Sequence, residues 1–237
     1  MTTGPAEFAP WLGVFETLRV INGVPLFAAE HREELERAAQ ALGLKPEFDL
    51  GGERQKLSSL SGRWRWIVTS LETRTLFTAE ELPALGPVGL SVSPVRVGSQ
   101  NWDARFKTIS YLSHAQAWKM ATTTDAILLN EHGHVASASR SNIFWRRRDR
   151  LFTPAHETGC RCGIVRGFVL KTCEVEAGHF PLGDVLAADE IFLTNSMRGI
   201  VSVDALEGRQ LGAPACAEEL RRGYDAAIQA QISSPGA

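Results

Sequence analysis

The pattern of apolar and polar positions changes its period within the first forty residues. Residues 13–20 (GVFETLRV) are rich in β-branched and aromatic side chains, and Asn22-Gly23 follows, which is the strongest short hairpin signal. Residues 24–28 are therefore expected to return as a second strand. From Glu30 the apolar positions recur at helical spacing and predict a helix that stops at Gly43. Its apolar positions are Leu35, Ala38, Ala39 and Leu42.

The middle of the chain predicts further strands and then a polar break. Residues 64–69 (WRWIVT) resemble a buried strand, and 73–78 can pair with it as a hairpin. Residues 90–97 alternate well, although Pro94 favours an edge position or a bulge. The polar, turn-rich stretch 98–104 (GSQNWDA) is interpreted as a linker between two lobes.

The rest of the chain mixes short strands and helices without a regular order. Helices are predicted at 113–121, 164–173 and 217–232, and strands at 125–129, 142–145, 150–152 and 190–193. Irregular alternation favours a two-lobe α+β protein over a doubly wound sheet. The expected divisions are a small lobe at 1–97, the linker at 98–104 and a larger lobe at 105–237.

Composition excludes several classes of function. The net charge is −2, and neither a long apolar run nor a basic region before an apolar core is present. We therefore expect no nucleic-acid partner, no membrane partner and no signal peptide. The basic run 146–150 (RRRDR) is expected to be a solvated hairpin tip.

Cysteine and histidine spacing gives no case for a disulfide or a metal site. The neighbouring pair Cys160 and Cys162 is poorly spaced for either, and no Cys-x-x-Cys occurs to complete a zinc site. His132 and His134 flank a turn-like glycine. Free thiols without an export signal indicate a cytoplasmic protein.

Three local features could carry chemistry, and each has an ordinary alternative. Lys107 lies in a weakly charged stretch (FKTISYL), where apolar surroundings would make the amine nucleophilic; otherwise it is a surface lysine. Residues 163–166 open a predicted helix whose N–H groups could bind phosphate, or they are a plain helix start. Residues 194–199 gather hydroxyl and amide donors after a strand, either around an anion or as a capped turn.

The order of five segments resembles the class IV (fold type IV) aminotransferases and aminodeoxychorismate lyases. These are GVFETLRVINGVPLFAAEH, FKTISYL, DAILLNEHGHVASASRSNIFW, LFTPAHETGCRCGIVRGFVL and DEIFLTNSMRGIVSV. The resemblance covers roughly residues 13–205. It implies the two-lobe α+β fold of the D-amino acid aminotransferase type, a homodimer, and pyridoxal 5′-phosphate (PLP) as cofactor.

The resemblance also implies roles for individual residues. Lys107 falls on the lysine that binds PLP and then moves the Cα proton of the substrate. Arg198 and Ser139 are candidates for the substrate side. The phosphate is expected at the backbone and donors of Gly163, Ile164, Val165, Asn195, Ser196 and Met197.

Three positions depart from the family pattern. Glu34 stands where an arginine usually binds the phosphate, and Arg37, one turn further on, could compensate. Ser137 replaces the glutamate that pairs with the pyridine nitrogen, and Val165 replaces a threonine near the phosphate.

Three functions therefore stay open. The first is transamination of a small amino acid or keto acid. The second is the lyase reaction that releases pyruvate and gives 4-aminobenzoate, which tolerates a weaker electron sink at Ser137. The third is a family member that has lost PLP and has a binding role.

Overall fold

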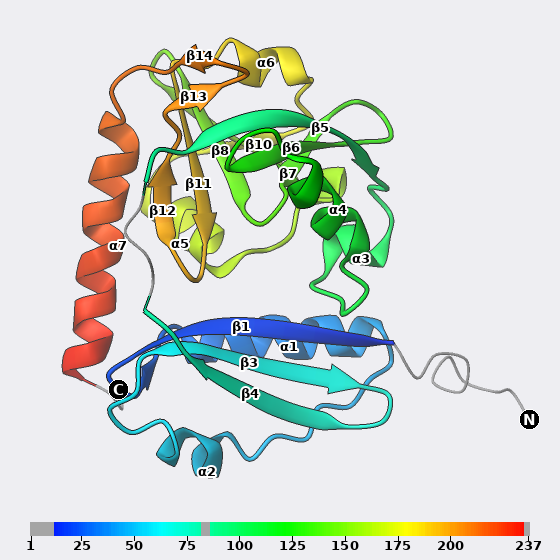
Figure 1. The fold of residues 1–237 in the computed structure, drawn as a ribbon, viewed down its shortest axis with the longest axis vertical. Coiled ribbons are helices and arrows are strands. Elements are labelled where there is room, and N and C mark those ends of the chain that lie inside the picture. The colour runs from blue at the N-terminus through cyan, green and yellow to red at the C-terminus, as the bar shows by residue number, and fades with distance from the viewer. Residues whose placement is uncertain (1–11, 82–85, 235–237) are drawn as a thin grey trace, which may run out of the picture. The chain divides into compact units, whose positions relative to one another are not determined.

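The computed structural model describes residues 12–81 and 86–234 (Figure 1). Contacts between Cα atoms divide the chain into two compact units. The described residues of the first unit are 12–81, 106–110 and 226–234, and those of the second are 86–105 and 111–225. The lobes predicted at 1–97 and 105–237, joined by a linker at 98–104, are continuous stretches of the chain. The two units instead combine separate segments, so the predicted lobes do not coincide with them and stay a prediction.

The first unit contains a four-stranded antiparallel sheet in the order β2-β1-β3-β4. Its strands are β1 (Gly13–Ile21), β2 (Val24–Pro25), β3 (Gly62–Thr69) and β4 (Thr73–Ala79). The β1–β2 turn has positive φ at both Asn22 (49°) and Gly23 (78°). Positive φ at both central residues defines a type I′ turn, whose twist matches that of the strands, so the predicted hairpin is confirmed.

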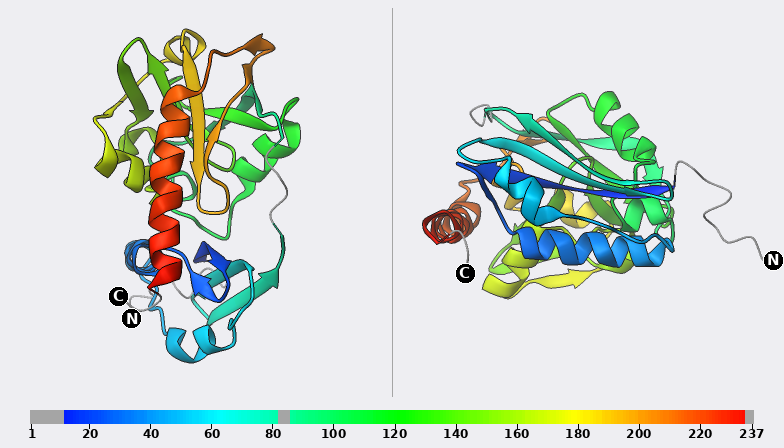
Figure 2. Two further views of the ribbon diagram at one scale, coloured as in Figure 1. Left: turned by 90° about the vertical axis from the view of Figure 1, so that its left-hand side faces the viewer. Right: turned by 90° about the horizontal axis from the view of Figure 1, so that it is seen from below.

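Helix α1 (Ala28–Ala41) runs along one face of this sheet (Figures 1 and 2), and α2 (Leu50–Gln55) follows it. The strand predicted to reach residue 28 is wrong beyond Pro25. Phe27 adopts a left-handed φ of 52°, and its N–H donates to Gln231 Oε1 at 2.8 Å instead of to a strand. The predicted helical apolar positions are all buried, in a core with Val14, Leu18, Val20, Trp64, Trp66, Val68 and Phe106.

The second unit contains two five-stranded sheets, β10-β9-β8-β11-β12 and β14-β13-β5-β6-β7. The strands are β5 (Gly89–Val97), β6 (Asp125–Asn130), β7 (Val135–Ala138), β8 (Asn142–Arg147), β9 (Arg150–Pro154), β10 (Glu176–Gly178), β11 (Glu190–Asn195), β12 (Gly199–Ser202), β13 (Ala205–Leu206) and β14 (Arg209–Gln210). Strand β5 pairs with both β6 and β13, so Pro94 does not lie in an edge strand. The register shift between Val92 and Arg96 is the bulge that accommodates this proline.

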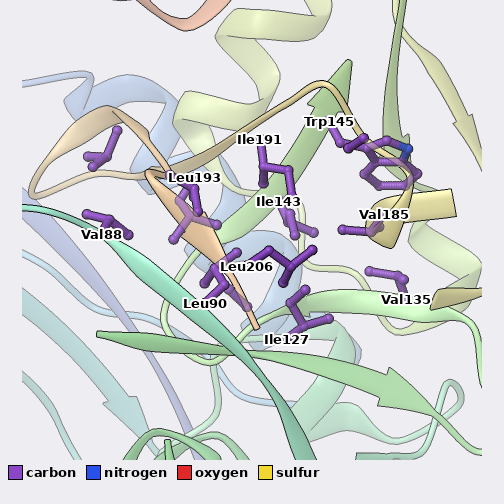
Figure 3. Packing of buried hydrophobic residues seen from close by; sticks show 14 of the residues in the cluster. Val88, Leu90, Ile127, Val135, Ile143, Trp145, Val185, Ile191, Leu193 and Leu206 are labelled. Carbon is purple, nitrogen blue, oxygen red and sulfur yellow. The ribbon is translucent and has the colours of Figure 1, made fainter. Parts of the chain in front are cut away.

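Apolar side chains from both sheets form one core in the second unit (Figure 3). Leu90, Ile127 and Val135 come from one sheet, and Ile143 and Ile191 come from the other. The helices of the second unit are α3 (Trp102–Arg105), α4 (Leu112–Met120), α5 (Ile164–Thr172) and α6 (Leu182–Leu186), and a 3-10 turn spans His156–Thr158. Helix α7 (Ala215–Ser233) belongs to the second unit up to residue 225 and to the first unit from residue 226. Helix α4 contacts β5 and β6, and α5 contacts β11.

The basic run forms the exposed turn between β8 and β9, as predicted. Arg148 has a left-handed φ of 55° at the tip. Three neighbouring arginines pair with acidic residues: Arg146 with Glu190 (3.6 Å), Arg147 with Asp184 (3.5 Å) and Arg150 with Glu176. Within residues 12–81 and 86–234, no helix is long and apolar enough to cross a membrane.

Candidate functional site

Lys107 is held in the first unit by backbone pairing with β1. Phe15 N–H donates to the Lys107 carbonyl at 2.8 Å, and Ile109 N–H donates to Gly13 O at 2.9 Å. The Lys107 side chain is half-buried, and its Nζ lies 5.2 Å from the centroid of the Phe15 ring. The lysine is therefore carried by an extended segment tied to a sheet, which restricts where its amine can point.

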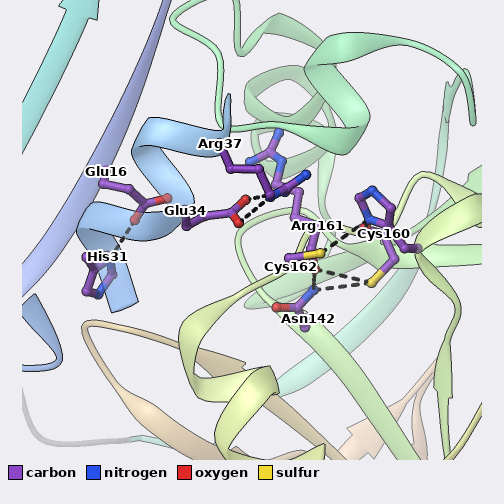
Figure 4. A network of polar contacts seen from close by, with 9 residues as sticks. Glu16, His31, Glu34, Arg37, Asn142, Cys160, Arg161 and Cys162 are labelled. Atoms are coloured by element: carbon purple, nitrogen blue, oxygen red, sulfur yellow. Dashed lines mark hydrogen bonds and ion pairs between the residues drawn. The ribbon is translucent and has the colours of Figure 1, made fainter. Parts of the chain in front are cut away.

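A buried acid–imidazole pair lies in the same unit (Figure 4). Glu16 Oε2 is 2.7 Å from His31 Nδ1, and both residues are buried. Burial by itself would raise the pKa of the Glu16 carboxyl. The positive charge of Lys107 and the hydrogen bond to His31 outweigh burial and hold this pKa below its ordinary value. Glu16 is therefore a carboxylate at neutral pH, and its negative charge interacts with the positive charge of Lys107.

Glu34 and Arg37 form a second pair, on α1. Arg37 donates from Nε at 2.9 Å and from Nη2 at 2.6 Å to the two carboxylate oxygens of Glu34 (Figure 4). Its guanidinium carbon also lies 4.9 Å from the centroid of the Phe106 ring. Burial raises the pKa of Glu34 in spite of these bonds. Arg37, the expected substitute for a phosphate-binding arginine, thus has two of its donors committed to Glu34.

Helix α5 begins in the second unit with backbone donors that have no acceptor among the described residues. Gly163 is the N-cap residue, and it has no side chain that could accept a hydrogen bond from the first N–H groups of the helix. In the described part of the chain, the N–H groups of Ile164, Val165 and Arg166 have no acceptor. Three adjacent N–H groups at the positive end of a nine-residue helix are suited to an anion such as phosphate.

Asn142 on β8 fixes the loop that leads into α5. Its Nδ2 donates to Arg161 O at 2.9 Å and to Cys160 Sγ at 3.3 Å (Figure 4). A Cβ added at Gly163 would lie 2.1 Å from Asn142 Oδ1, so only glycine fits this position without displacement. Asn142 was absent from the predicted site residues, although a polar residue at the start of the apolar strand NIFW was a usable signal.

The turn between β11 and β12 is organised by the side chain of Asn195. Its Oδ1 accepts from Met197 N–H at 3.1 Å and from Arg198 N–H at 2.9 Å, and its Nδ2 donates to Ser141 Oγ at 2.9 Å. Two of the donors expected around an anion are thus engaged inside the turn. Ser196 is the remaining candidate here for contact with a ligand.

The two serines of the β7 region differ sharply in their partners. Ser139 is fully buried, and both its N–H (3.0 Å) and its Oγ bond to Asp125 Oδ1. Ser137 on β7 is 5% exposed, and its Oγ has no partner among the described residues. A buried hydroxyl without a partner is costly, so Ser137 is the serine with capacity for a ligand.

The predicted site residues thus separate into two groups. Lys107 and Arg37 belong to the first unit, and Ser137, Ser139, 163–165 and 195–198 belong to the second. Glu16 and His31 were also missed by the sequence reasoning, because a Glu and a His at this spacing are unremarkable until the fold brings them together.

A family model described as amino-transferase class IV matches residues 13–206, well over half of the 237 residues. The chain belongs to the class IV aminotransferase family. This family includes PLP-dependent transaminases and lyases, among them aminodeoxychorismate lyases and branched-chain aminotransferases.

Three relatives illustrate the range within the class IV aminotransferases. The aminodeoxychorismate lyase of Bacillus subtilis (strain 168) is 26% identical over 83% of this chain and 78% of its own. A putative branched-chain amino acid aminotransferase from Thermotoga maritima has a TM-score of 0.82, at 24% identity over 94% and 88% of the two chains. An aminotransferase from Brucella abortus bound to PLP has a TM-score of 0.77, at 22% identity over 94% and 91%. These structures establish the α+β fold of type IV.

The residues present fit PLP in most respects. In the second unit, the free N–H groups at the start of α5 suit its phosphate, and the unpartnered Ser137 hydroxyl suits a ring nitrogen. In the first unit, Lys107 offers an amine on a fixed backbone. The exception is Glu34, because a half-buried acid paired with Arg37 adds no positive charge for a phosphate.

Proposed function

We propose that this class IV enzyme is a PLP-dependent aminotransferase acting on a small amino acid or keto acid, with Lys107 as the cofactor lysine. The observation that carries the proposal is the placement of Lys107. Its backbone is bonded to Phe15, the residue is half-buried, and a buried carboxylate, Glu16, interacts with its charge. A surface lysine without function would have no need of this environment.

Each proposed contact has a separate role. The N–H groups of Ile164 and Val165 would bind the cofactor phosphate, and Ser196 would add a donor from the β11–β12 turn. Ser137 would hydrogen-bond the pyridine nitrogen. Bound PLP supplies an electron sink for the substrate Cα. Lys107 would take the Cα proton and return it.

On the substrate side, Arg198 and Ser139 are the proposed residues. Arg198 lies in the β11–β12 turn, where its N–H donates to Asn195 Oδ1 and so fixes the backbone of this residue. Ser139 is bonded to Asp125, so it would contribute through its position in the fold and not through a free donor.

The lyase reaction is the second candidate, and Ser137 favours it. A hydroxyl cannot hold a proton on the pyridine nitrogen by charge as a carboxylate does. The unprotonated ring is a weaker electron sink, which should slow transamination more than elimination of pyruvate. The likeness to the Bacillus subtilis aminodeoxychorismate lyase over most of both chains also supports this candidate.

The visible spectrum of the purified protein with added PLP tests the proposal. We expect an absorbance band that borohydride traps, and peptide mass spectrometry that locates the adduct on Lys107. Lys107→Ala should lose both. Lys119→Ala is the matched control, because Lys119 is exposed on α4 and should leave the band unchanged.

The outcomes separate the three functions. A trapped band with amino-group exchange between amino and keto acids supports the aminotransferase, and a trapped band with pyruvate release from aminodeoxychorismate supports the lyase. No band at saturating PLP would overturn both and favour the PLP-free binding role. Light scattering in the same preparation tests the homodimer that we expect from the family resemblance.

A further inference from the structure

Arg161 is a half-buried cation that has no acidic partner in the described part of the chain. It lies between the 3-10 turn and the start of α5, two residues before Gly163. Across residues 12–81 and 86–234, no carboxylate lies within ion-pair distance of its guanidinium, whereas Arg146, Arg147 and Arg150 each have one. Charges removed from water are normally paired, so an unpaired arginine has capacity to bind an anion.

The position of Arg161 is tightly constrained. Its Nη2 donates to Asp103 O at 2.6 Å and to His114 Nδ1 at 3.3 Å. Its guanidinium carbon lies 4.4 Å from the centroid of the Tyr111 ring, and this ring stacks on His114 at 4.8 Å. The backbone is fixed too, because Asn142 Nδ2 donates to Arg161 O. The guanidinium is therefore held before any ligand arrives, which lowers the entropy cost of binding.

The contacts of Arg161 orient its charge without neutralising it. Asp103 contributes only its backbone carbonyl, since its carboxylate accepts from Ser113 Oγ at 3.3 Å. Burial, with the nearby Arg161 charge, lowers the pKa of His114 to about 2, so this imidazole is neutral. Its Nδ1 accepts from Arg161, which places the ring proton on Nε2. Nη1 of Arg161 makes no hydrogen bond with any residue that the structure describes.

We propose that Arg161, oriented by Tyr111 and His114, is an oxyanion-binding residue that receives either a substrate carboxylate or the cofactor phosphate. The identity of the anion rests on the proposed function, but the anion site itself does not. Planar guanidinium groups bind both kinds of oxyanion through charge-assisted hydrogen bonds. A carboxylate would make Arg161 a determinant of substrate choice, and a phosphate would make it the cation that Glu34 does not supply.

Calorimetric titration of the purified full-length protein tests this inference without requiring PLP. The probes are benzoate, for a carboxylate, and inorganic phosphate, each in chloride-free buffer. We expect Arg161→Gln to weaken binding of one or both probes by about ten- to a hundredfold, as expected for loss of a charged hydrogen bond. Arg161→Lys should weaken it less, because it keeps the charge but loses the planar group. Arg148→Gln, at the exposed tip of the β8–β9 turn, is the matched control.

Each result has a defined meaning. Loss of benzoate binding alone supports a substrate carboxylate, and loss of phosphate binding, with or without benzoate, supports the cofactor phosphate. Equal binding by wild type and Arg161→Gln, or no binding of either probe by wild type, overturns the inference. Circular dichroism checks folding, and Arg161→Lys keeps the test decisive if Arg161→Gln does not fold. Anion binding that depends on Arg161 in a protein without a PLP band would sustain the inference and reject the proposed function.

Discussion

Replacing Glu16 by glutamine should destabilise the protein more at neutral pH than in acid. The substitution keeps an acceptor for His31 and removes the negative charge. The pKa of Glu16 is lowered in the folded state. The ionised carboxylate therefore stabilises the fold at pH values above its ordinary pKa of 4.5. This stabilisation is lost as the pH falls through the folded pKa.

The magnitude follows from the geometry of the buried pair. The side chains of His31 and Glu16 are 2% and 9% exposed, and their atoms are 2.7 Å apart. A hydrogen bond to a charged group contributes about 1.5–3 kcal/mol and a neutral one about 0.5–1.5 kcal/mol, so Glu16→Gln should cost about 1–2 kcal/mol at pH 7. Glu16→Leu, which leaves His31 without its partner, should cost about 3–5 kcal/mol.

Urea unfolding followed by circular dichroism, at pH 7 and at pH 4, measures the effect. Glu34→Gln is the counterpart on the same unit, because burial raises the pKa of Glu34 and its ionised form is disfavoured. We therefore expect no loss of stability at pH 7 for that variant. The electrostatic reasoning would be refuted if Glu16→Gln lowered the free energy of unfolding equally at both pH values. It would also be refuted if Glu34→Gln lowered this free energy at pH 7 as much as Glu16→Gln does.

Two further substitutions test the second unit. Ser137→Ala should leave the urea midpoint unchanged or slightly higher, because the hydroxyl has no partner among the described residues. A titration with PLP should show weaker binding and a shifted absorbance band. An unchanged titration would exclude Ser137 from the cofactor site. Gly163→Ala should displace Asn142, whose Oδ1 would lie 2.1 Å from the new Cβ, and so lower stability by about 1–3 kcal/mol and weaken PLP binding. A thermal melt and the same titration check this, and unaltered values would show that the loop before α5 adjusts freely.

Several elements were predictable from local pattern alone. The Asn22-Gly23 turn, the apolar stripe of α1, the buried strand β3 and the exposed β8–β9 tip depend on neighbours a few residues apart, which periodicity and turn chemistry report directly. Boundaries were less predictable. The strand before α1 stops early because Phe27 bonds to Gln231, which is 204 residues away in the chain.

The candidate site also had a part that was predictable from the sequence and a part that was not. The order of segments was enough to single out Lys107, the start of α5 and the departures at Glu34, Ser137 and Val165. It could not reveal that Arg37 is paired with Glu34, although the two are only three residues apart, because each side chain had other rotamers available.

The order of residues along the chain was enough to give the family, the main elements and the residue types available for chemistry. The partners of those residues depend on the folded arrangement. Asn195 is committed to its own turn and to Ser141, and Glu16 is committed to His31. Arg161 has no acidic partner among the described residues. The physical reason is that periodicity depends on adjacent residues, whereas desolvation and charge pairing depend on groups that only the folded chain brings within a few ångströms.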